Sequence, residues 1–261
     1  MSYQYPKLKI KKLYLMSGLF LSAFNTAYCT ENLAYLSQIG ERQSTIIFQS
    51  GQENKLHLEQ ASQSGSLTGV GNLSQLSQTG LANNITATQE NSYNQATIEQ
   101  LGNANQAILT QVSVDNIAYI TQANDNNHIT LSQDNSAGVM AGNGNFAGAS
   151  QTGLLNSADI IQAGLSNTVQ LAQSGYDNTA GLVQQGQDNI INAVQSLANN
   201  QAQIEQNGNG NQVNLAQTGI NNYAGVTQYG NNNIATIIQS GNNQNINITE
   251  YGGMSVTVIQ P

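Results

Sequence analysis

The segment Gln100-Leu-Gly-Asn-Ala-Asn-Gln-Ala-Ile-Leu-Thr-Gln111 contains the pattern that decides the fold. Its two terminal glutamines are eleven residues apart, a glycine stands two residues after the first, and Asn105 stands six residues before the second. From Asn105, every second residue belongs to one set: Ala107, Leu109 and Gln111. A period of two over seven residues predicts a half-buried β-strand whose amides and aliphatic side chains share one face.

The same unit recurs along most of the chain as Gln-x-Gly-x-x-Asn-x-φ-x-φ-x-Gln, where φ is apolar. Self-similarity at a fixed period predicts stacked structural units. The repeated glutamines are Gln38, Gln49, Gln60, Gln78, Gln89, Gln100, Gln111, Gln122, Gln133, Gln151, Gln162, Gln173, Gln184, Gln195, Gln206, Gln217, Gln228 and Gln239. The repeated asparagines are Asn54, Asn83, Asn94, Asn105, Asn116, Asn127, Asn156, Asn167, Asn178, Asn189, Asn200, Asn211, Asn222 and Asn233. The repeated glycines are Gly40, Gly51, Gly80, Gly102, Gly153, Gly164, Gly175, Gly186, Gly208, Gly219, Gly230 and Gly241.

Each unit is long enough for one seven-residue strand and a turn of about four residues, rich in Gly, Asn, Asp and Ser. A single strand cannot bury its apolar face, so we expect two successive strands to fold back to back into a 22-residue rung. About ten rungs would stack in parallel at roughly 4.8 Å spacing. The predicted fold is an all-β, two-sided parallel β-solenoid with an amyloid-like cross-section. Twenty strands are expected, starting at Asn32, Gln43, Asn54, Asn72, Asn83, Asn94, Asn105, Asn116, Asn127, Asn145, Asn156, Asn167, Asn178, Asn189, Asn200, Asn211, Asn222, Asn233, Gln244 and Met254.

The inward Gln and Asn positions predict structural amide ladders. An amide buried without a partner costs about 1–3 kcal/mol, but identical amides one rung apart can hydrogen-bond into a continuous column. Such a column also opposes a one-residue slip, which would turn every side chain to the wrong face. The alternative is that these amides lie at strand ends and face solvent.

The domain organisation follows from the same pattern. Residues 1–29 combine a basic start with a short apolar run and are predicted to be a secretory signal peptide. Residues 30–261 form the predicted repeat solenoid. Two 18-residue spacings interrupt the period, so we expect seven-residue insertions near residues 61–71 and 134–144.

Composition excludes several classes of function. Beyond Lys12 the basic residues are Arg42 and Lys55, against fourteen acidic residues, so neither nucleic-acid binding nor membrane insertion is expected. His57 and His128 would lie three rungs apart, too far to share a metal ion. Acidic residues are scattered over different rungs rather than clustered in a groove, so no catalytic site, metal site or cofactor is predicted.

The ends of the predicted stack carry no polar cap. The first strand begins close to the expected cleavage site, and the last, from Met254, runs to the penultimate residue. Each end would present unpaired strand backbone. A head-to-tail contact that does not close into a ring makes a filament, so we expect a self-assembling subunit.

In its repeat units the chain resembles the curlin repeat family, the subunits of bacterial curli fibres. Residues 100–111 match the family motif Gln-x-Gly-x-x-Asn-x-Ala-x-x-x-Gln throughout, as do residues 228–239. The resemblance implies an extracellular functional amyloid on the surface of a Gram-negative bacterium, which supports biofilm and adhesion. It also implies other curlin subunits, a dedicated outer-membrane secretion channel and periplasmic chaperones as partners.

The chain departs from the family in carrying ten repeats instead of the usual five and almost no targeting tail before them. The uniform unit resembles the minor, nucleating subunit more than the major one, although Gln239 to Pro261 has no Lys or Arg. The alternative function is a monomeric β-solenoid adhesin, or an accessory subunit that does not polymerise alone.

Overall fold

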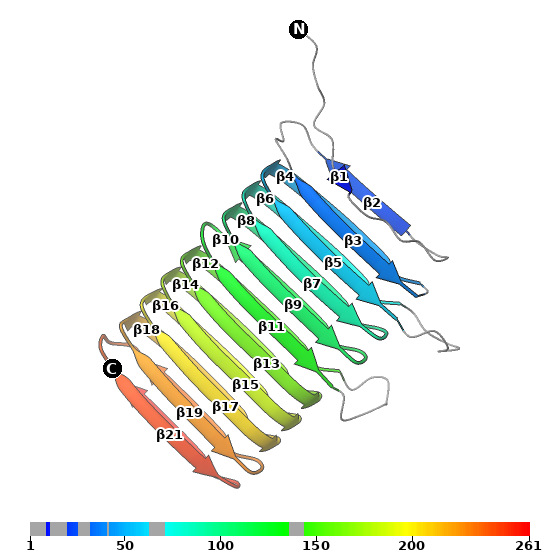
Figure 1. The fold of residues 1–261 in the computed structure, drawn as a ribbon. Helices are drawn as coiled ribbons and strands as arrows, with labels where there is room; N and C mark the ends of the chain where they lie inside the picture. The colour runs from blue at the N-terminus through cyan, green and yellow to red at the C-terminus, as the bar shows by residue number, and fades with distance from the viewer. Residues whose placement is uncertain (1–8, 11–19, 26–31, 41, 63–70, 136–143) are drawn as a thin grey trace.

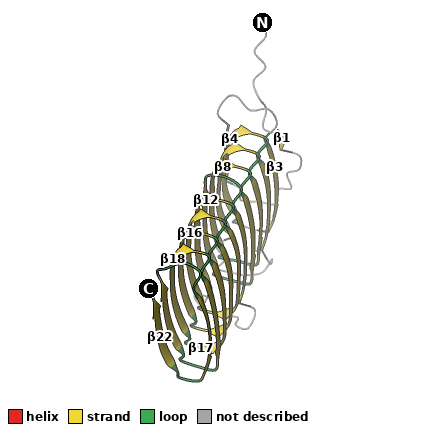
Figure 2. Ribbon diagram, turned by 90° about the vertical axis from the view of Figure 1, so that its left-hand side faces the viewer, coloured by secondary structure: helices red, strands yellow, loops and turns green. Residues whose placement is uncertain are grey.

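The computed structural model describes residues 9–10, 20–25, 32–40, 42–62, 71–135 and 144–261. These residues form two parallel sheets of eleven strands each, stacked face to face (Figures 1 and 2). Odd-numbered strands make one sheet, here called sheet A, and even-numbered strands make the other, sheet B. The predicted fold class, a two-sided β-solenoid of about ten 22-residue rungs, is therefore confirmed.

Strands of the two sheets alternate along the chain. Sheet A contains β1 (Lys9–Ile10), β3 (Leu33–Ile39), β5 (Lys55–Ala61), β7 (Asn84–Glu90), β9 (Gln106–Val112), β11 (His128–Asp134), β13 (Ser157–Leu165), β15 (Thr179–Gln187), β17 (Gln201–Asn209), β19 (Tyr223–Tyr229) and β21 (Asn245–Tyr251). Sheet B contains β2 (Phe20–Asn25), β4 (Ser44–Gln52), β6 (Leu73–Leu81), β8 (Gln95–Asn103), β10 (Ile117–Ala123), β12 (Phe146–Leu154), β14 (Thr168–Tyr176), β16 (Ile190–Ala198), β18 (Gln212–Ile220), β20 (Ile234–Gln239) and β22 (Ser255–Gln260).

The register between rungs aligns the repeats residue by residue. Gln111 of β9 pairs with Gln133 of β11, and Gln122 of β10 pairs with Gln151 of β12. The second pair has seven extra residues between its members, yet the register is the same. The two predicted insertions lie mostly at residues 63–70 and 136–143, outside the described residues.

The core is a thin layer between the sheets. On β13, Ala158 and Ile160 point inward and are fully buried, whereas the neighbouring Ile161 points outward and is 47% exposed. Inward pairs of one small and one large aliphatic side chain recur through the stack, which keeps the two sheets close together.

Many turns are shorter than the predicted four residues, whereas others, such as residues 113–116 between β9 and β10, have the predicted length. Strands such as β14 run for nine residues, through the repeat glycine, and leave only a two-residue corner before the next strand. The corner residue before the repeat asparagine often has a positive φ, as at Asp177 and Asp188. Backbone pairing continues through the glycine because glycine tolerates the required left-handed conformation.

The segment predicted as a signal peptide contains two of the described strands. β1 pairs with β3, and β2 pairs with β4, so both lie against the first rung of the repeats (Figure 1). None of the described residues forms a helix long and apolar enough to cross a membrane.

Candidate functional site: amide columns and the ends of the stack

The repeat glutamines form two columns inside the solenoid, one on each sheet. In sheet A, Gln111 Nε2 donates to Gln133 Oε1 at 2.9 Å and also to the main-chain oxygen of Gln95 at 3.0 Å. Gln133 repeats this arrangement towards Gln162 and the main-chain oxygen of Ile117. All eighteen repeat glutamines from Gln38 to Gln239 are at most 6% exposed. Each donates to the residue one rung nearer the C-terminus, so both glutamine columns have the same polarity.

The repeat asparagines form a second pair of columns with the opposite polarity. The main-chain nitrogen of Asn156 donates to Asn127 Oδ1 at 3.1 Å, so the donor is the residue nearer the C-terminus. Asn127 Nδ2 donates to the main-chain oxygens of Ala123 at 2.9 Å and Gly153 at 2.8 Å. Each such asparagine therefore closes its own corner and attaches that corner to the next rung. The other repeat asparagines are also buried.

The repeat glycines lie where successive corners stack most closely. Gly102 has a φ of +117°, and a Cβ added to it would lie 2.2 Å from the main-chain oxygen of Asn124. That distance excludes a side chain without movement of the backbone. Eleven of the twelve repeat glycines have φ between +87° and +156°; Gly241 is the exception.

Two hydroxyls on sheet B strands bridge successive glutamines of the sheet A column at the N-terminal end of the stack. Thr45 Oγ1 of β4 accepts a hydrogen bond from Gln38 and donates one to Gln60 Oε1 at 2.8 Å. Ser74 does the same between Gln60 and Gln89. Sequence reasoning missed both residues, although each stands where most later units carry an aliphatic residue at this inward position.

Three buried side-chain oxygens among the described residues lack a hydrogen-bond partner, and all three lie at the ends of the glutamine columns. Gln38 Oε1 and Gln49 Oε1 are the first acceptors of the sheet A and sheet B columns. Glu250 Oε1 lies in the last rung of sheet A, where a carboxylate occupies the repeat glutamine position. Sequence reasoning missed Glu250 as a column member, although it stands eleven residues after Gln239.

The last rung differs from the interior in its other columns too. Gln260 ends the sheet B glutamine column and accepts from Gln239 at 2.8 Å. Gln244 and Met254 end the two asparagine columns, and their main-chain nitrogens donate to Asn222 and Asn233. All side chains of β22 are at least partly exposed.

Both histidines lie on strands of sheet A, His57 on β5 and His128 on β11. His57 contacts Glu59 at 3.1 Å and stacks on Tyr35, with ring centroids 4.4 Å apart, while His128 contacts Thr130. In the described parts of the chain, no cluster of three or more His, Cys, Asp or Glu could hold a metal ion.

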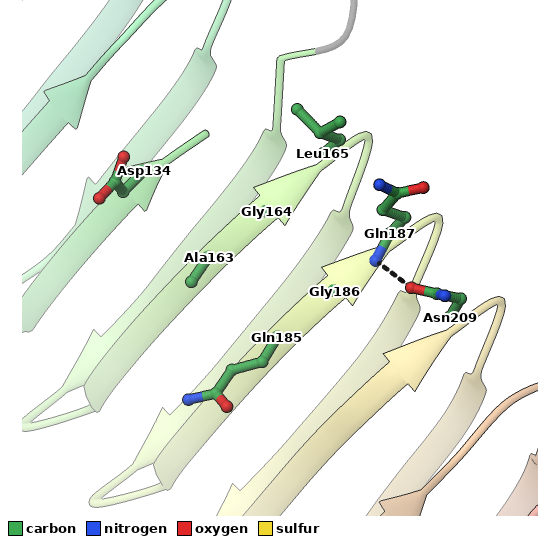
Figure 3. Close-up of a pocket in the computed structure, with 8 residues that line it drawn as sticks. All are labelled: Asp134, Ala163, Gly164, Leu165, Gln185, Gly186, Gln187 and Asn209. Carbon is green, nitrogen blue, oxygen red and sulfur yellow. Dashed lines mark hydrogen bonds between the residues drawn. The ribbon is translucent and has the colours of Figure 1, made fainter. Parts of the chain in front are cut away.

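A surface hollow lies over the corners of sheet A. Asp134, Ala163, Gly164, Leu165, Gln185, Gly186, Gln187 and Asn209 line it (Figure 3). The Gln187 main-chain nitrogen donates to Asn209 Oδ1 at 2.9 Å, so this amide also joins successive rungs. The lining contains a single carboxylate and no basic group.

Parallel sheets in register, four buried amide columns and stacked corners define a two-sided β-solenoid repeat protein. The family described as "Curlin associated repeat" matches residues 198–230 and 219–252, which span β17 to β21. The chain therefore carries curlin repeats in this part of the stack, and the resemblance indicated by the sequence is confirmed. A comparison with curated proteins found no match.

Proposed function

We propose that this chain is a structural subunit of an extracellular curli-type amyloid fibre, which supports biofilm formation and adhesion at the surface of a Gram-negative bacterium. Curlin proteins are structural rather than enzymatic. In this proposal each subunit folds as the observed solenoid and joins the next subunit end to end, so that both sheets continue through the fibre.

One observation carries the proposal: every interior rung pairs with identical registers on both sides, and the last rung offers the same geometry outwards. Among the described residues none pairs with the outer edges of β21 and β22. Strand edges of this length recruit further strands. A second copy is the partner whose strands match this register at every residue.

Assembly at the N-terminal end of the stack requires one further step. β1 and β2 lie on the first rung, and both belong to the predicted signal peptide, residues 1–29. Removal of that peptide during export would expose the edges of β3 and β4. We therefore propose that cleavage generates the second assembly surface. Mass spectrometry of the exported protein should place its N-terminus near residue 30, and retention of residues 9–25 would contradict this step.

The amide columns support a structural role for the repeat Gln and Asn residues. In the fibre they would continue across subunit junctions, set the register and provide hydrogen-bond partners for the buried amides within each subunit. A dedicated outer-membrane channel, periplasmic chaperones and other curlin subunits are the partners that this function requires.

The test uses the exported form of the chain, diluted from denaturant at micromolar concentration. Amyloid-dye fluorescence should rise after a lag, and fibre diffraction should show reflections near ~4.7 Å and ~10 Å. A persistently soluble, folded β monomer would contradict the proposal and favour an adhesin or an accessory subunit. Seeding by trace amounts would separate the two curlin roles, because a nucleating subunit should remove the lag of another curlin.

A further inference from the structure

The two ends of the sheet B glutamine column are complementary. At the C-terminal end, one hydrogen of Gln260 Nε2 is directed to the main-chain oxygen of Asn245. An amide nitrogen has two hydrogens, so a second donor is available for the next rung. At the N-terminal end, Gln49 Oε1 is a buried acceptor without a partner. When the C-terminal face of one copy meets the N-terminal face of the next, Gln260 can donate to Gln49 as glutamines do within the stack.

The two ends of the sheet A column are not complementary in the same way. Gln228 Nε2 donates to Glu250 Oε2 at 2.5 Å, so the carboxylate accepts the last hydrogen bond of the column. Its other oxygen, Oε1, replaces the amide nitrogen that would donate onwards, and it is buried without a partner. The first group of the next copy in this column is Gln38 Oε1, also an acceptor. An ionised Glu250 would therefore place its acceptor oxygen against the acceptor oxygen of Gln38, and no hydrogen bond could form between them.

We propose that Glu250 makes end-to-end joining of two copies of this chain depend on a proton. This inference rests on the proposed fibre function. A protonated Glu250 has one O–H donor, which can donate to Gln38 of the next copy and complete the sheet A column. An ionised Glu250 has no donor, leaves Gln38 unsatisfied and places a charge in the closed junction, which is strongly unfavourable. Acid should therefore speed joining, and neutral pH should slow it.

None of the other side chains in the surrounding strands carries a positive charge that could neutralise an ionised Glu250. Of the elements packed against Glu250, β20 and β22 contain no ionisable side chain. The ionisable side chains of β19 and β21 besides Glu250 are Tyr223, Tyr229 and Tyr251, whose positions alternate away from the core.

The opposing face of the next copy also offers little charge. Its described strands β3 and β4 contain Tyr35, which points outward, and no Asp, Glu, Lys or Arg. Arg42 lies at the corner that follows β3, four residues after Gln38, but its side chain is exposed and so lies outside the core. Glu250 would therefore meet the amide of Gln38 in the core of the junction.

The experiment measures elongation of preformed fibre seeds by the exported chain at about pH 4 and about pH 7.5, on either side of the range in which carboxylates ordinarily titrate. Seeded elongation isolates the joining step from nucleation. Wild type should elongate at least about fivefold faster at the lower pH, roughly the effect of one hydrogen bond gained. Glu250→Gln restores the amide donor, so it should lose this pH dependence and elongate at neutral pH as fast as wild type does in acid.

Two variants make the result specific. Glu99→Gln removes one exposed carboxylate from the outer face of β8, in the middle of the stack, and should leave the wild-type pH dependence unchanged. Gln260→Glu places a second carboxylate at the junction and should increase the pH dependence. If Glu250→Gln keeps the wild-type ratio of rates, the inference is wrong while the fibre function stands. If wild type and Glu250→Gln form no fibres at either pH, the proposed function fails and the inference fails with it.

Discussion

Gln133 and Gln162 are joined by a side-chain hydrogen bond of 2.9 Å, although 29 residues rather than the usual 22 separate them. The seven additional residues leave the column unchanged, because the strands on either side pair in the same register as every other rung. The amide column therefore tolerates insertions between strands. A substitution in the column itself should be far more costly, because it leaves buried amide groups without hydrogen-bond partners.

Gln122→Ala should lower the free energy of unfolding of the solenoid by about 2–4 kcal/mol, because it leaves buried polar groups unsatisfied on two rungs. Gln122 accepts from Gln100 and donates to Gln151 and the main-chain oxygen of Gln106. Urea unfolding followed by circular dichroism measures the change. Gln170→Ala, on the exposed face of β14, is the control and should cost less than about 0.5 kcal/mol. Equal stability of the two variants would show that the column contributes nothing.

Gly102→Ala should destabilise the solenoid by more than about 2 kcal/mol, since the new Cβ would lie 2.2 Å from the Asn124 main-chain oxygen at a φ of +117°. The matched control is Gly148→Ala on β12, whose added Cβ would meet nothing nearer than 3.7 Å, on the Phe146 ring. Thermal unfolding of both variants provides the comparison. Similar melting temperatures would mean that corner stacking can relax around a methyl group.

Thr45→Val should cost about 1–2 kcal/mol, because the substitution removes the hydroxyl that links Gln38 and Gln60 while keeping the volume of the side chain. Thr121→Val on the exposed face of β10 makes the same chemical change where no buried amide depends on it. Hydrogen exchange should show faster opening of β3 and β4 in Thr45→Val alone. Unchanged protection there would contradict a linking role for this hydroxyl.

Ile160→Ala should cost about 2–5 kcal/mol by opening a cavity in the thin core between the sheets. The next residue supplies the control, because Ile161 is 47% exposed and Ile161→Ala opens no cavity. Urea midpoints of the two variants measure the difference. A larger loss at residue 161 would mean that the two faces of β13 had been assigned the wrong way round.

Periodicity was enough to predict the strands and the two-sided stack. On β9, Ala107, Leu109 and Gln111 repeat every second residue, so a parallel stack that buries one of them must bury all three. The eleven-residue unit requires each strand to reverse into the other sheet, and the 22-residue rung follows. These features depend on local spacing, which is readable along the chain.

The lengths of the turns could not be predicted from this periodicity. The glycine two residues after each glutamine has the composition of a turn residue, yet at Gly175 it still pairs with the neighbouring strands. Whether a glycine with positive φ belongs to a strand depends on the carbonyl stacked against it from the next rung. That contact is between residues 22 apart.

The order of amides along the chain specifies which residues form columns, but only the assembled stack decides their polarity. Glutamine side chains donate towards the C-terminus because their second hydrogen is held by a main-chain carbonyl of the opposite sheet, as in Gln111 with Gln95. Asparagine columns run the other way because a main-chain nitrogen is the donor. An amide can face either direction, and contacts between sheets select one. The same tertiary contacts make Glu250 the acceptor that ends its column, since polarity determines whether a carboxylate at that position completes a hydrogen bond or opposes one.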